Sequence, residues 1–74
     1  MRFIYNKLRG RIVEKFGSQA EFSKYIGQSE QIVSAKLAGN SSFTQDNIIA
    51  WSWALDIDQH DIGVYFFTHE VSNG

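Results

Sequence analysis

Hydrogen-bonding side chains gather in the stretch GQSEQIVSAK, Gly27 to Lys36, which reads as a turn followed by the start of a helix. The amide of Gln31 both donates and accepts, the hydroxyl of Ser34 does either, and the carboxylate of Glu30 only accepts. Free backbone N–H groups at such a helix start attract an anion such as phosphate, whereas Glu30 repels one. The stretch therefore has the chemistry of a recognition surface, and Glu30 decides which partner fits it.

Other reactive side chains do not form a catalytic or metal-binding pattern. The segment DIDQHDIG, residues 56–63, superficially resembles a calcium loop, but Asp61 stands where that loop needs glycine and Phe67 where it needs its bidentate acid. His60 and His69 lack triad or zinc-ligand spacing, and the chain has no cysteine and no glycine-rich phosphate loop. We expect a protein that is not an enzyme and that uses no metal or cofactor.

Five helices must position the polar residues, because apolar residues recur at helical spacing along most of the chain. Residues that favour helix starts precede each segment, and glycines follow the first three. The predicted N-caps are Asn6, Ser18, Ser29, Thr44 and Asp58. The predicted inward-facing residues are Leu8, Ile12, Val13 and Phe16, then Ala20, Phe22 and Ile26, then Ile32, Val33 and Leu37, and finally Ile48, Ile49 and Leu55. Trp51 and Trp53 lie two positions apart, so they cannot both face inward.

The expected fold class is therefore all-α: a five-helix bundle in a single domain, residues 1–74. Ser18 and Glu21 form an S-x-x-E capping box, and the two helices around Gly27 are joined by so tight a turn that they must cross steeply. This pair, about residues 18–39, is a predicted helix-turn-helix. Asp58 can cap a short fifth helix through Ile62, Tyr65 and Phe66. Beyond that, the sequence VYFFT, residues 64–68, is rich in β-formers and is expected to give a strand or an extended C-terminal tail.

Charge is distributed unevenly along the chain. All seven Lys and Arg residues lie in residues 1–36, which carry a net charge of +4, while residues 37–74 carry −5. The basic half suggests one face for a polyanion, with Arg2, Lys7, Arg9 and Arg11 as a candidate phosphate-facing cluster. Chance in a short chain is the alternative. No signal peptide and no membrane span is expected, and the lack of cysteine fits a reducing cytoplasm.

The segment SQAEFSKYIGQSEQIVSAKLAG resembles the Cro/repressor-type helix-turn-helix family of temperate phages and bacteria. The matching residues are Gln19, Phe22, Ser23, Ile26, Gly27, Ser29, Val33 and Gly39. The opening YNKLRGRIVEKFGS and the ending VYFFTHEV resemble a group of small temperate-phage regulators more narrowly. Some such proteins bind operators as Cro does, and others bind the phage repressor itself. The resemblance implies a lambda-repressor-like fold and a part in the lysis–lysogeny switch.

The resemblance also implies roles for individual residues. Gln19 and Ser29 would hydrogen-bond phosphates, and Asn40, Ser41 and Ser42 would approach the DNA backbone beyond the helix. The residues that would face base edges are Glu30, Gln31, Ser34 and Ala35. Lys36 takes a position that is often apolar in the family and is a further candidate contact, although Lys24 and Lys36 read more readily as solvated surface. Glu30 has an equally plausible structural reading, because a first-turn carboxylate stabilises a helix by ~0.3–1 kcal/mol. Gln31 and Ser34 could also be ordinary solvated residues of the helix, and the basic cluster of residues 2–11 could be an ordinary helix surface.

Two functions follow. The first is a Cro-like repressor that docks on double-stranded operator DNA as a homodimer, with the third helix in the major groove. The second is an anti-repressor that binds a phage repressor protein and occludes its DNA-binding surface. The basic half, Gln31 and Ser34 favour DNA, whereas the overall charge of −1 and Glu30 favour the repressor. On these residues, operator binding is the favoured function and repressor binding the alternative.

Overall fold

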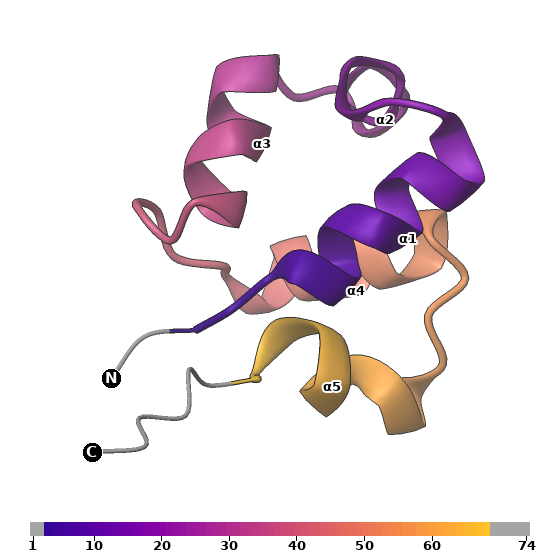
Figure 1. Ribbon diagram of the computed structural model, residues 1–74, viewed down its shortest axis with the longest axis vertical. Helices are drawn as coiled ribbons and strands as arrows, with labels where there is room; N and C mark the ends of the chain where they lie inside the picture. The colour runs from indigo at the N-terminus through magenta and orange to yellow at the C-terminus, as the bar shows by residue number, and fades with distance from the viewer. Residues whose placement is uncertain (1–2, 69–74) are drawn as a thin grey trace.

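The structure, a computed structural model, describes residues 3–68 and consists of helices joined by short connections (Figure 1). The elements are α1 (Asn6–Phe16), α2 (Gln19–Ile26), α3 (Glu30–Leu37), α4 (Gln45–Ala54), a 3-10 turn η1 (Gln59–Asp61) and α5 (Ile62–Phe66). No β-strand forms within residues 3–68. Phe3 is the one residue of this range that belongs to an isolated β-bridge. The prediction of an all-α, five-helix fold is confirmed.

The helix starts follow the capping residues closely. Ser18 accepts a hydrogen bond from the backbone of Glu21 at 3.2 Å, and Ser29 accepts one from Ile32 at the same distance. Thr44 and Asn47 form a reciprocal capping box at 3.1 Å, an arrangement that satisfies two backbone donors of α4 at once. Three predicted N-caps are thereby confirmed, and Asp58 likewise caps η1 through His60. The capping box predicted for Ser18 and Glu21 forms only by half, because the carboxylate of Glu21 lies toward Lys24 at 3.5 Å instead of returning to Ser18.

Two local predictions are wrong. Asn6 is the first residue of α1 and not its cap. Tyr5 occupies the cap position and makes no side-chain cap bond, and its ring is instead buried in the core. The strand or tail predicted for VYFFT is wrong for residues 64–66, which form the last turn of α5. The predicted fifth helix through Ile62 and Phe66 is confirmed, and Phe66 packs into the core at 2% exposure. The part of the predicted tail from residue 69 onward lies outside the described residues.

The core is built around Trp51, which is 1% exposed. Its ring meets the rings of Phe22 and Phe43 edge-on, at centroid distances of 4.9 and 4.8 Å. Trp53, by contrast, is 82% exposed, so the prediction that only one tryptophan faces inward is confirmed. The buried apolar residues are Tyr5, Leu8, Ile12, Phe22, Val33, Leu37, Trp51, Leu55, Ile57 and Phe66.

The buried stripe of each helix is narrower than the sequence pattern predicts. Val13, Ile32 and Ile49 were expected to face inward, and they are 56%, 47% and 53% exposed. In each case a neighbour along the helix takes the inward position: Ile12 and Val33 are completely or almost completely buried, and Ile48 packs against the core. These three apolar residues are thereby left on the surface.

Two arginines of α1 hold the ends of other helices. Arg9 donates to the carbonyl oxygen of Leu37 at 2.9 Å, and Arg11 donates to that of Leu55 at 2.8 Å. These carbonyls lie at the C-terminal ends of α3 and α4, where backbone acceptors lack helical partners and the helix dipole favours a cation. At the other edge of the fold, the backbone N–H of Ile4 donates to the carbonyl of Thr68 at 2.8 Å, which joins the segment before α1 to the segment after α5.

Candidate functional site

The candidate site is the surface formed by α2, the turn after it, and α3. Gly27 adopts the left-handed conformation with φ 74°, and its neighbour Gln28 donates its backbone N–H to the carbonyl oxygen of Ser23 at 3.1 Å. The chain therefore changes direction between α2 and α3 within three residues. Figure 1 shows the result: α2 is seen end-on while α3 lies across the view. Ser23 is 3% exposed and is small enough to lie at the contact between the helices.

The outer face of α3 carries most of the residues predicted to make contacts. Glu30, Gln31 and Ser34 are exposed, as is Ser29 at the cap, and Ala35 is half-buried. Sequence reasoning missed that Ile32 of α3 is an exposed apolar residue of this face, at 47%. It also missed Tyr25 of α2, which is 69% exposed and whose ring lies 5.1 Å from that of Phe16 of α1; Tyr25 could have been found, since it falls outside the apolar spacing of Phe22 and Ile26 on the same helix. We call Glu30, Gln31, Ile32 and Ser34 the α3 surface.

Gln19 makes an internal contact that the sequence did not suggest. Its side-chain amide donates to the hydroxyl of Ser34 at 2.9 Å. The bond ties the start of α2 to the middle of α3 and fixes how Ser34 is presented. Two side chains expected to contact phosphate and base separately are therefore bonded to each other.

Lys36 is not the solvated residue that the sequence favoured. It is 7% exposed, its ammonium donates to the carbonyl oxygen of Ser42 at 2.8 Å, and it lies 5.6 Å from the centroid of the Phe43 ring. The aliphatic stem takes the inward position that is often apolar, while the charge meets the loop after α3. Helical periodicity could not predict this contact, because it depends on the path of the loop after α3 that carries Ser42.

The burial of Lys36 gives a stability prediction. Lys36→Met should change the free energy of unfolding by less than ~1.5 kcal/mol, because it keeps the stem's volume and removes a buried charge. Lys36→Ala should cost about 2 kcal/mol or more through the cavity it leaves. Urea unfolding of both variants checks this. Equal destabilisation by the two substitutions would mean that the ammonium contacts dominate over packing.

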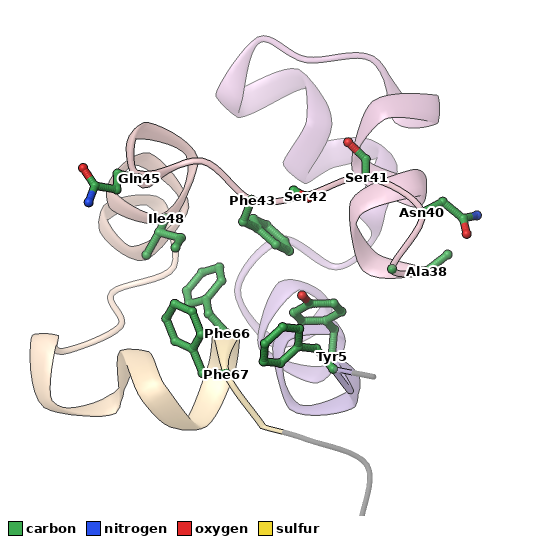
Figure 2. A pocket seen from close by; sticks show the side chains of 12 residues that line it. Tyr5, Ala38, Asn40, Ser41, Ser42, Phe43, Gln45, Ile48, Phe66 and Phe67 are labelled. Atoms are coloured by element: carbon green, nitrogen blue, oxygen red, sulfur yellow. The ribbon is translucent and has the colours of Figure 1, made fainter. Parts of the chain in front are cut away.

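Asn40 and Ser41 lie away from the α3 surface. They belong to the loop before α4 and line a pocket of about 550 Å³ together with Ser42, Gln45 and several aromatic residues. Figure 2 shows Asn40 and Gln45 pointing away from the rings of Phe43 and Phe66. An eight-residue helix is roughly 12 Å long, and Glu30 and Asn40 lie at opposite ends of α3, so the structure does not bring these two residues together.

The cations of the described chain all have partners within the protein. Besides Arg9, Arg11 and Lys36, Lys15 pairs with Asp56, Lys24 lies 3.5 Å from Glu21, and Lys7 lies 5.6 Å from the Tyr65 ring centroid. The hydrogen bond and charge of Lys15 lower the pKa of Asp56 below its usual range. Arg2 of the proposed phosphate-facing cluster lies outside the described residues, and the other three members are used in these contacts.

The described residues, 3–68, contain no group of three or more His, Asp or Glu side chains placed to hold a metal ion. Among the described helices, none is long and apolar enough to cross a membrane.

Comparison with known proteins gives two results. Residues 1–69 match the family described as "Protein of unknown function (DUF739)". The solution structure of the modulator of repression (MOR) of the temperate bacteriophage TP901-1 from Lactococcus lactis is similar at 36% sequence identity and a TM-score of 0.81, over 97% of each chain. Among curated proteins there is no significant sequence match. With its match over nearly the whole length and its close structural likeness to a phage regulator, this chain belongs to the DUF739 family.

Proposed function

We propose that this protein is a modulator of repression that binds a phage repressor and occludes the surface with which the repressor contacts its operator. The observation that carries the proposal is the likeness to the TP901-1 modulator of repression, at 36% identity over 97% of both chains. That likeness supports the second of the two functions that the sequence left open. Because a shared fold alone does not establish function, the chemistry of the α3 surface must also fit.

The α3 surface has the chemistry that complements a DNA-reading protein. Such a protein presents Lys and Arg toward the phosphates, and its partner needs acceptors and no free cation. Glu30 offers an acceptor-only carboxylate at the exposed start of α3, flanked by the neutral amide of Gln31. Exposed Ile32 adds apolar area to the same face.

The internal use of the basic residues also supports a protein partner. An operator-binding protein gains most of its affinity from cations that neutralise phosphates. Here Arg9 and Arg11 bond helix-end carbonyls, and Lys36 is buried. Using them on phosphate would cost contacts that hold α3 and α4 in place.

Operator-binding assays distinguish the functions. The protein alone should leave operator DNA from its own genetic switch unshifted in a gel, and it should abolish the shift caused by the repressor of that switch when added in excess. Isothermal titration calorimetry should show direct binding to the purified repressor. A repressor shift that survives a large excess of this protein would contradict the proposal.

Operator binding is the second candidate function, favoured by the exposed N-terminus of α3 with its Ser29 cap and exposed Gln31. It would produce a shift with this protein alone, and log affinity would fall steeply with log salt concentration. The same gel therefore tests it.

A further inference from the structure

The outer face of α4 carries a stripe of exposed side chains, three of them apolar and one a carboxylate, that no other described helix covers. Asp46, Ile49, Ala50 and Trp53 recur at helical spacing and are all exposed, with Ile49 at 53% and Trp53 at 82%. We call these four residues the α4 stripe. None of them belongs to the α3 surface. We propose that the α4 stripe is a second contact surface, on which Trp53 receives an arginine or lysine side chain of the repressor.

The charge around the stripe identifies the chemistry of its occupant. Residues 37–68 contain no Lys or Arg and carry Asp46, Asp56, Asp58 and Asp61. Lys15 balances Asp56, whereas Asp46 and Asp61 form no ion pair with any described residue. Arg11 and Lys15 of α1 reach the C-terminal end of α4, where Arg11 bonds Leu55 and Lys15 pairs with Asp56, so Asp46 is the carboxylate of the stripe itself that is left without an ion pair among the described residues. Tryptophan is the most favourable aromatic residue for a cation above the ring. The complementary surface is therefore basic and partly apolar.

A second copy of this chain fits the stripe less well. A stable interface buries roughly 800 Å² on each partner, and one buried aromatic side chain supplies roughly 150–250 Å². Trp53, Ile49 and Ala50 together fall well short of the required area. Pairing two α4 stripes would also supply no arginine or lysine from the stripe itself to pair with Asp46 or to lie over Trp53. The stripe has instead the character of an anchor, one large aromatic residue inside a wider contact.

The choice of the repressor as occupant rests on the proposed function, while the stripe itself is a separate surface on a separate helix. A DNA-binding partner supplies the basic side chains that the stripe requires. The two surfaces together would contact the repressor at two places and bury a larger area than the α3 surface alone. Removal of either anchor should then weaken the complex without abolishing the fold.

The experiment uses the two tryptophans as separate reporters. The protein is labelled with 5-fluorotryptophan, and its two fluorine NMR signals are assigned with Trp53→Tyr. Adding the unlabelled, purified repressor should shift the Trp53 signal and leave the signal of buried Trp51 nearly unchanged. Titration calorimetry should show that Trp53→Ala raises the dissociation constant at least about tenfold, while Trp53→Tyr, which keeps an aromatic face, stays within about threefold. Val64→Ala is the matched control, since Val64 is an exposed apolar residue of α5 at 44%.

Several outcomes would overturn the inference, and each has its own signature. If Trp53→Ala binds the repressor as tightly as the native protein while a substitution at Glu30 weakens binding, the α4 stripe is not a contact and the proposed function stands. If the native protein does not bind the repressor at all, both proposals fail. A Trp53 signal that moves with protein concentration in the absence of the repressor would assign the stripe to a second copy of this chain.

Discussion

Trp51→Ala is expected to remove most of the stability of the fold and to leave no more than about 2 kcal/mol at room temperature. Replacing a buried tryptophan with alanine costs about 3–5 kcal/mol, and a domain of this size has a total stability on the order of 5 kcal/mol. The ring contacts with Phe22 and Phe43, at 4.9 and 4.8 Å, would be lost at the centre of the core. Circular dichroism with urea titration measures the loss of helix and the change in midpoint.

Trp53→Ala is the matched control, because it removes the same side chain two positions away, at a site that is 82% exposed. Its free energy of unfolding should change by no more than ~0.5 kcal/mol. Trp51→Phe should fall between the two, since it keeps a ring in the core and removes an indole N–H that has no hydrogen-bond partner. Equal effects of the two alanine substitutions would contradict the assignment of Trp51 as the centre of the core.

Glu30→Lys is expected to weaken binding to the repressor by about 30-fold or more, which corresponds to about 2 kcal/mol. A lysine at this exposed position would face the partner's basic surface, and like charges brought together across an interface cost several kcal/mol. The fold should tolerate the change, since the cost at the start of α3 is limited to the helix-dipole term of ~0.3–1 kcal/mol. Calorimetric titration with the purified repressor, at two salt concentrations, measures the effect and its screening.

Glu14→Lys makes the same change in net charge at an exposed residue of α1 that belongs to neither the α3 surface nor the α4 stripe, and should leave repressor affinity nearly unchanged. Glu30→Gln should give a smaller loss than Glu30→Lys, because it removes the charge without reversing it. If Glu30→Lys instead creates a gel shift on operator DNA and leaves repressor binding intact, the second candidate function gains and the modulator proposal fails.

Much of the helical architecture could be predicted from the sequence, because the residues that start and end a helix act through local contacts. Ser29 and Thr44 cap helices because a side-chain oxygen satisfies a backbone N–H three residues on, which needs no information from elsewhere in the chain. Gly27 ends α2 with φ 74° for an equally local reason. The exposure of one tryptophan followed from helical geometry alone.

The partners of the long polar side chains could not be read in the same way. Arg11 bonds the carbonyl of Leu55, 44 positions along the chain, and Gln19 bonds Ser34 across two helices. Whether Lys36 is buried or exposed depends on the path of the loop that carries Ser42. Such contacts depend on how the helices pack, so the charge pattern indicated a basic half of the chain without showing that its cations serve the fold.

The hydrogen bond between Ile4 and Thr68 bears on how the protein is made. Phe66 belongs to the core, and α5 packs against α1, so residues from both ends of the described chain complete the same structure. A nascent chain still held by the ribosome before Phe66 has emerged cannot close this core. Folding to the native state must therefore finish after residues 66–68 have left the ribosome, in one cooperative step. Only then are the surfaces of α3 and α4 held in the positions described above.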